Sequence, residues 1–236
     1  NHRGRPTRQG GTPVQLNFSG AQFITDPYPI GLTKPAFDDE SYEALVESFP
    51  PLSLLPAFGG AGYKKFALNE KMQPYHTFLE SSPIWWAFQN SIKSIKFIDF
   101  ILNLLVDKGI PVLPAKQWTS RFEFAAMPAD GGKIDPHTDT AYKAVTLIFS
   151  MLRPGEWDPA FGGGTDVLRP KDPTARLESY KAPLSEFDVA HTYPYTPNQC
   201  VIFVKNDVSW HSVGPMLGVG SPLMRRTITL NIERAA

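Results

Sequence analysis

The chain has 236 residues with 42% hydrophobic and 12% aromatic content, which fits a single globular domain with its own core. Its 23 basic residues balance 23 acidic ones, and this neutrality argues against nucleic acid or an anionic membrane as a partner. The single cysteine, Cys200, excludes an intramolecular disulfide, and we expect a reducing cytoplasm as the compartment. No signal peptide or membrane-spanning segment is predicted.

The first half of the chain carries the helix signals. Residues 1–25 contain arginines but no acidic residue, and we predict a flexible N-terminal arm there. In residues 26–115, Asp38 or Asp39 can cap a helix that ends before Pro50. A second helical run begins at Pro83 and continues, with room for a break, toward Gly109, because glycine often ends a helix. We expect this region to form a helical support.

From residue 116 onward the pattern changes to short β-type runs between turn-rich segments. The order of helices first and strands afterwards predicts an α+β, mainly β fold, in which residues 116–236 form a strand-built core on the helical support as one domain. The segment 169–197 is long and lacks a strand pattern, which predicts a mobile cover over a site. The expected strands are 118–125, 144–152, 165–168, 200–204 and 226–232.

The clearest candidate site is the sequence Asp-Pro-His-Thr-Asp that ends at Asp139. Residues i and i+2 of a strand point to the same face, so His137 and Asp139 can present an imidazole and a carboxylate side by side. His211 follows an expected strand and a turn, and can supply a second imidazole. Two histidines and one carboxylate form the facial triad typical of non-haem iron(II). His191 remains a weaker candidate to line the site, and we assign no role to His2 and His76.

The order of motifs from about residue 121 to 232 resembles the prolyl-4-hydroxylase-like branch of the 2-oxoglutarate/Fe(II) oxygenases. The resemblance rests on the His-x-Asp motif, the strand after it, the Gly-Gly turn at Gly163, the strand that precedes Trp210-His211, and the final run from Arg225 to Leu230. It implies a double-stranded β-helix (jelly roll) core, with Fe(II), 2-oxoglutarate and O₂ as the cofactor and co-substrates. It also implies hydroxylation of a substrate C–H bond with release of succinate and CO₂; desaturation or ring formation would use the same triad.

The resemblance further implies that Arg225 binds the C5 carboxylate of 2-oxoglutarate, with Thr227 as a hydroxyl partner. A guanidinium fork matches a carboxylate, and strand alternation puts both side chains on one face. Two features depart from the family pattern. The spacing from His211 to Arg225 is longer than usual, which leaves Arg226 as a competitor, and Met127 stands where many relatives have a tyrosine. The Arg-x-Thr pairing favours Arg225 inside the barrel, with Ile228 and Leu230 turned outward against the helices.

Other functions and substrates remain open from the sequence. A cupin-like metal enzyme that does not use 2-oxoglutarate would share the barrel and histidines, and a binding module with a dead site would share the fold. We expect a small-molecule or peptide substrate, and more readily a small molecule or amino-acid derivative than a prolyl residue of a protein. Aromatic residues of the loop and its surroundings could cover it, or each could equally pack in the core: Trp157, Tyr180, Tyr193, Tyr195 and Trp210, with His191 among them. The oligomeric state is not predicted.

Overall fold

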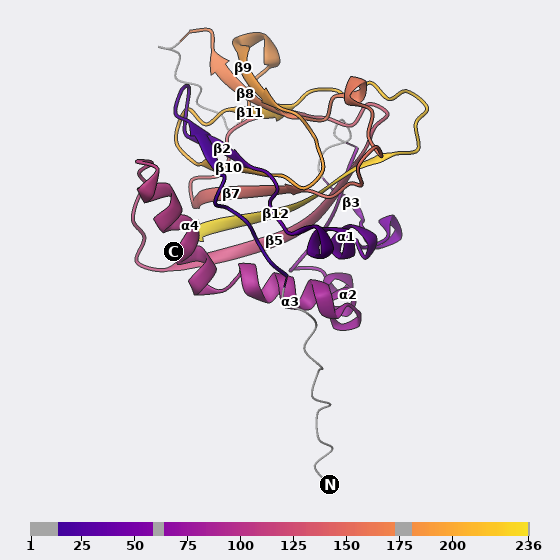
Figure 1. Cartoon of the computed structure of the whole chain (residues 1–236). Helices are drawn as coiled ribbons and strands as arrows, with labels where there is room; N and C mark the ends of the chain where they lie inside the picture. The colour runs from indigo at the N-terminus through magenta and orange to yellow at the C-terminus, as the bar shows by residue number, and fades with distance from the viewer. Residues whose placement is uncertain (1–13, 59–63, 173–180, 236) are drawn as a thin grey trace.

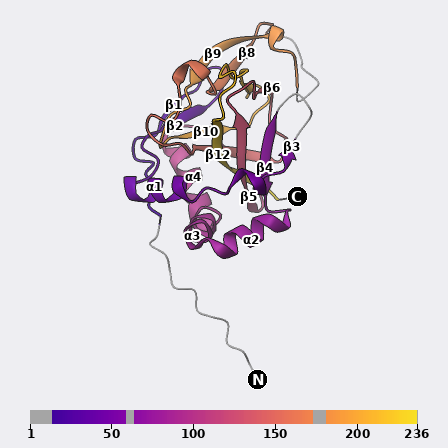
Figure 2. The same cartoon turned by 90° about the vertical axis from the view of Figure 1, so that its right-hand side faces the viewer.

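The computed structural model describes residues 14–58, 64–172 and 181–235, and these form three layers (Figure 1). Helices cover the outer face of a large antiparallel sheet, and a smaller antiparallel sheet lies over its inner face. The view from the side shows the same order of helices, large sheet and small sheet (Figure 2). This mainly β, jelly-roll architecture is the predicted one. No helix in the described ranges is long and apolar enough to cross a membrane.

The helical layer is built from four helices of the described chain. Asp38 caps the first of them, as predicted, by accepting a hydrogen bond from the backbone N–H of Ser41 at 3.0 Å. Pro83 stands at the start of the third, and Gly109 ends the fourth with a positive φ of 72°. The second helix was not predicted. The helices are α1 (Asp39–Glu47), α2 (Gln73–Ser81), α3 (Pro83–Ile92) and α4 (Ile95–Asp107).

The large sheet has the strand order β1-β2-β10-β7-β12-β5-β4-β3, and the small sheet has the order β6-β11-β8-β9. The bounds in the large sheet are β1 (Gln22–Ile24), β2 (Ile30–Thr33), β3 (Ala57–Phe58), β4 (Lys65–Asn69), β5 (Trp118–Pro128), β7 (Lys143–Ser150), β10 (Cys200–Val204) and β12 (Met224–Arg234). Those in the small sheet are β6 (Ile134–His137), β8 (Thr165–Pro170), β9 (Phe187–Tyr193) and β11 (His211–Val213).

The main core lies between the helices and the outer face of the large sheet. Phe124 on β5 is fully buried there and meets Trp85 of α3 edge to face, with 4.8 Å between ring centroids. Ile228 and Leu230 of β12 belong to the same core. Because aliphatic side chains of β12 fill this outer face, strand alternation leaves the polar residues of β12 on the inner face. Polar side chains on the inner face of the large sheet can therefore line a cavity.

Three expectations about segments need correction. Part of the flexible arm, residues 1–13, lies outside the described residues, but Phe18 is buried and β1 belongs to the large sheet. The region 26–115 supplies strands β2, β3 and β4 as well as helices. The loop 169–197 is not strand-free, because β9 pairs with β8 along its length. The interior residues of β9 are exposed, so this edge strand has no alternating apolar pattern by which it could be predicted. Residues 173–180 of that loop lie outside the described residues.

Candidate active site

His137, Asp139 and His211 converge at one end of the small sheet. His137 is the last residue of β6 and His211 the first of β11, and the two lie directly opposite each other in the ladder. Their ring centroids are 4.2 Å apart. Asp139 lies just beyond the end of β6, rather than within a strand as predicted, yet its carboxylate still reaches the two rings. One nitrogen or oxygen from each side chain lies within 4.8 Å of the others, so one ion could contact all three.

Backbone carbonyls orient both imidazoles. Nδ1 of His137 lies 2.9 Å from the carbonyl oxygen of Asp135, and Nδ1 of His211 lies 3.0 Å from that of Ser209. A carbonyl can only accept, so each Nδ1 carries the proton and each Nε2 keeps a free lone pair. Burial, reinforced by neighbouring His211, lowers the pKa of His137 to about 3. Burial also lowers the pKa of His211, so both rings are neutral near pH 7, the form that binds metals.

Asp139 is held on both carboxylate oxygens. Its Oδ1 accepts a hydrogen bond from Nζ of Lys143 at 2.7 Å, and its Oδ2 accepts one from Oγ1 of Thr146 at 2.8 Å. Burial alone would raise the pKa of Asp139, but His211 and Lys143 outweigh it, and the pKa falls below its usual range. The carboxylate is therefore ionised and fixed in place.

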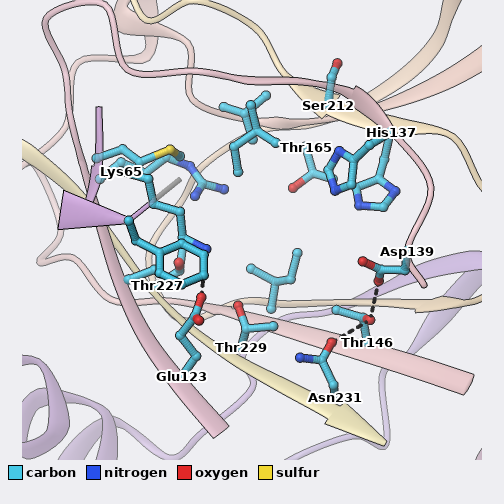
Figure 3. A pocket seen from close by; sticks show the side chains of 18 of the residues that line it. Lys65, Glu123, His137, Asp139, Thr146, Thr165, Ser212, Thr227, Thr229 and Asn231 are labelled. Atoms are coloured by element: carbon cyan, nitrogen blue, oxygen red, sulfur yellow. Dashed lines mark hydrogen bonds and ion pairs between the residues drawn. The ribbon is translucent and has the colours of Figure 1, made fainter. Parts of the chain in front are cut away.

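A second contact of Thr146 extends this network from β7 to β12, the neighbouring strand of the large sheet (Figure 3). Oγ1 of Thr146 also lies 3.0 Å from the side-chain amide of Asn231. The threonine hydroxyl has one proton, and ionised Asp139 has none to offer, so the hydroxyl donates to Asp139. The atom of Asn231 that faces the hydroxyl is Oδ1; because the single hydroxyl proton goes to Asp139, a flip of the amide would turn its NH₂ group toward Thr146 as the donor. Two strands of the large sheet thus orient a carboxylate that follows a strand of the small one.

This donor set fits a divalent transition metal. Two neutral imidazole nitrogens and one carboxylate oxygen are the ligands of the facial triad, which leaves open positions on the metal for other molecules. Zinc sites with three protein ligands use similar donors, so the triad does not by itself identify the metal. The residues that surround the triad help to identify the metal.

A cavity of about 240 Å³ opens beside the three side chains, between the two sheets. Arg225 points into it from β12 and is only 5% exposed. Its Nε donates to the carbonyl oxygen of Gly163 at 2.5 Å, and its guanidinium lies 5.1 Å from the ring of Tyr195. Burial lowers the pKa of Arg225 although the charge of Asp166 opposes this shift, and no carboxylate forms an ion pair with Arg225 in the described part of the chain. A buried guanidinium without a counter-ion is costly unless a ligand supplies the negative charge.

The register of β12 is the predicted one. Arg225 and Thr227 line the cavity, whereas Arg226 points to the other face. There Arg226 donates to both carboxylate oxygens of Glu156, at 2.7 and 2.8 Å. Met127 lies opposite Arg225 in the ladder, so this position supplies no tyrosine hydroxyl.

Several cavity residues were not predicted from the sequence. They share one property: they are polar residues of the inner face of the large sheet. The sequence did contain a signal for them, the two-residue alternation of side chains along a strand. Applied beyond Arg225 and Thr227 to the rest of β12 and to the neighbouring strands, it would have placed these residues on the inner face. The missed residues are Lys65, Arg121, Glu123, Lys143, Thr146 and Asn231.

Of the two possibilities for the aromatic residues, the structure shows packing in the protein interior and not a cover over the site. Trp157, Tyr193, Tyr195 and Trp210 are buried in small apolar clusters, and none lines the cavity. His191 is exposed on β9 and does not line it either. His76 is bonded to the carbonyl of Glu70 on the surface, whereas Tyr180 and His2 lie outside the described residues.

The fold and the site together define a class of structure: a double-stranded β-helix with two histidines and a carboxylate at one open end. The sequence matches no family model and no curated protein. Among solved structures, a prolyl-4-hydroxylase from Pseudomonas putida is 14% identical, with a TM-score of 0.52 over 87% of this chain and 92% of its own.

Two further structures were crystallised with 2-oxoglutarate. HygX from Streptomyces hygroscopicus, with nickel, 2-oxoglutarate and hygromycin B bound, is 11% identical, with a TM-score of 0.57 over 90% of this chain and 85% of its own. The viral collagen prolyl hydroxylase of Paramecium Bursaria Chlorella virus-1, a 2-oxoglutarate complex, is 11% identical, with a TM-score of 0.51 over 90% of this chain and 99% of its own. The chain therefore has the fold of prolyl-4-hydroxylases and other 2-oxoglutarate/Fe(II) oxygenases.

Proposed function

We propose that this protein is an Fe(II)- and 2-oxoglutarate-dependent oxygenase that hydroxylates a C–H bond of a small-molecule, amino-acid or peptide substrate, with release of succinate and CO₂. The observation that carries the proposal is a pairing within one cavity. A two-histidine, one-carboxylate group lies at one side, and a buried guanidinium without a counter-ion lies at another. An α-keto acid with two carboxylates is the kind of ligand that would use both.

His137, Asp139 and His211 would hold the iron, through the two Nε2 atoms and the carboxylate. Arg225 would receive the distal carboxylate of 2-oxoglutarate, with the Thr227 hydroxyl beside it on the same face of β12. Lys143 and Thr146 would keep Asp139 ionised and oriented. When bound, the iron with 2-oxoglutarate and O₂ supplies the oxidising chemistry, and the protein positions the partners and limits water.

The alternatives from the sequence explain less of the site. A cupin-like enzyme that does not use 2-oxoglutarate would leave the buried charge of Arg225 unexplained. An inactive binding module would leave unexplained why Asp139 and both imidazoles are held in ligand-ready forms. Neither alternative is favoured by a specific observation. The buried single cysteine suits a reducing cytoplasm as the proposed compartment.

Isothermal titration of 2-oxoglutarate into the protein tests the proposal, first with Mn²⁺ present and then with metal removed by chelator. We expect saturable, metal-dependent binding. Mass spectrometry should then detect succinate formed from 2-oxoglutarate when Fe(II), ascorbate and O₂ replace Mn²⁺. Absence of 2-oxoglutarate binding with the metal bound would refute the proposal.

A further inference from the structure

The wall of the cavity away from the candidate metal site carries an ion pair. Nζ of Lys65 on β4 lies 2.7 Å from Oε1 of Glu123 on β5, and both residues line the cavity. Figure 3 shows this pair across the cavity from His137 and Asp139. An ion pair on a cavity wall is a feature that the iron and 2-oxoglutarate do not require.

The strand geometry directs the pair into the cavity. Ala67 lies opposite Ala125, and Glu123 is opposite Asn69, two residues further along β4. Lys65 must therefore extend over the two alanines to reach Glu123, and only methyl-sized side chains there leave the space. The carboxylate is thereby held above the inner face, beside Thr229, its partner on β12. The ring of Phe58 lies 5.1 Å from Nζ of Lys65, within the range of a cation–π contact that stabilises the ammonium.

A count of the charges that line the cavity indicates what kind of second ligand it suits. Lys143 is paired with Asp139, Arg121 with Glu233 outside the lining, and Lys65 with Glu123. Within the described chain, Arg225 is the lining cation that has no carboxylate partner, and the proposed function assigns it to 2-oxoglutarate. A second ligand thus meets a wall whose charges already balance.

That balance disfavours ligands with a single charge. A ligand with only a carboxylate would attract Lys65 but would place its charge beside Glu123, and a ligand with only an ammonium would meet the converse problem. Separating a pair that is largely removed from water leaves one charge uncompensated, which is strongly unfavourable. A ligand with both charges gives each partner a new counter-ion, so the free energy lost on opening the pair is recovered.

We propose that Lys65 and Glu123 form the substrate subsite and bind a free amino acid or similar small zwitterion, with the carboxylate on Lys65 and the ammonium on Glu123. The proposal rests on the proposed oxygenase function and narrows its substrate class. The cavity of about 240 Å³ must hold 2-oxoglutarate as well, and it lies below the roughly 300–1,000 Å³ of common ligand pockets, so only a small second ligand fits beside the co-substrate. A blocked residue within a peptide would lack both charges.

The test uses the full chain loaded with Mn²⁺ and 2-oxoglutarate, so that ligands bind without turnover. The probes are the twenty free amino acids, their N-acetyl derivatives and their methyl esters, each titrated by calorimetry. We expect at least one free amino acid to bind, and both of its blocked forms to bind roughly tenfold more weakly or worse, since each loses a charge-assisted contact. Equal binding of a blocked form, or no binding by any free amino acid, would overturn the proposal.

Two variants assign the two ends. Lys65→Met should abolish the discrimination between the free amino acid and its methyl ester, whereas Glu123→Gln should abolish the discrimination against the N-acetyl form. Lys64→Met is the matched control, because Nζ of Lys64 donates to the backbone carbonyl of Asp130 and Lys64 does not line the cavity. Its selectivity should stay that of the wild type.

Binding of 2-oxoglutarate, titrated in every variant, separates this inference from the function on which it rests. The three variants should bind 2-oxoglutarate within about threefold of the wild type. If Lys65→Met weakened 2-oxoglutarate instead of the amino acid, Lys65 would be a co-substrate contact and the zwitterion subsite would be refuted. If the wild type did not bind 2-oxoglutarate at all, the proposed oxygenase function itself would be refuted.

Discussion

The assignment of Arg225 rather than Arg226 as the carboxylate anchor makes a sharp prediction, because the two arginines are adjacent and face opposite ways. Arg225→Met keeps a long apolar side chain but removes the charge and the fork. Arg226→Met is the matched control, since Arg226 pairs with Glu156 away from the cavity. We expect the first variant to lose 2-oxoglutarate binding and the second to keep it.

The expected loss of 2-oxoglutarate affinity in Arg225→Met follows from the burial of the guanidinium. Arg225 is 5% exposed, and its contacts with Gly163 and Tyr195 leave the far side of the fork for a ligand. Loss of a charge-assisted contact to a buried carboxylate costs about 2–5 kcal/mol, which raises the Kd by roughly 30-fold to more than a thousandfold. Arg225→Lys keeps the charge without the bidentate geometry and should fall between.

The assay is calorimetric titration of 2-oxoglutarate in the presence of Mn²⁺, with thermal unfolding as the check on folding. The Arg226–Glu156 pair is partly exposed, so Arg226→Met should lower stability by no more than about 1 kcal/mol. A large rise in Kd for Arg226→Met with none for Arg225→Met would refute the register-based assignment. If the Kd for 2-oxoglutarate changed in neither variant, another cation of the cavity would have to bind its distal carboxylate.

The remaining predictions concern the metal site and the core. Alanine in place of His137, Asp139 or His211 should abolish Mn²⁺ binding by calorimetry and succinate formation, with circular dichroism unchanged; near-normal turnover by one variant would remove that residue from the metal site. Thr146→Val removes the hydroxyl that orients Asp139 and should weaken Mn²⁺ binding roughly 10- to 100-fold, whereas an unchanged Kd would deny it that role. Phe124→Ala should lower the free energy of unfolding in urea by about 3–5 kcal/mol, because the ring is fully buried; a loss under about 1 kcal/mol would contradict its place in the core.

Much of the fold follows from local patterns in the sequence. Asp38, Pro83 and Gly109 mark helix ends through capping and backbone preferences that act within a few residues. Runs of β-type residues located five of the strands, because buried central strands need apolar residues. The short or exposed strands, of which β9 is the clearest, escaped prediction because their stability comes from hydrogen bonds to neighbours rather than from their own side chains.

The candidate metal residues could be predicted because their spacing is itself the signal. His137 and Asp139 are two residues apart, and the order of motifs identified His211 far along the chain. It was harder to predict from the sequence which face of β12 points into the barrel, since either face of a strand can carry aliphatic side chains. The helices decide it: Ile228 packs against them, so Arg225 has to face the cavity.

What only the tertiary structure decided is how residues on separate strands meet. Nothing local in the sequence links Thr146 to Asn231, or Lys65 to Glu123, because each contact depends on which strands pair and in which register. A one-residue shift in register would turn every one of these side chains to the opposite face. The residues of the candidate metal site can therefore be recognised from short sequence motifs. The polar inner face of the large sheet, which would select a substrate, forms only when its strands have paired.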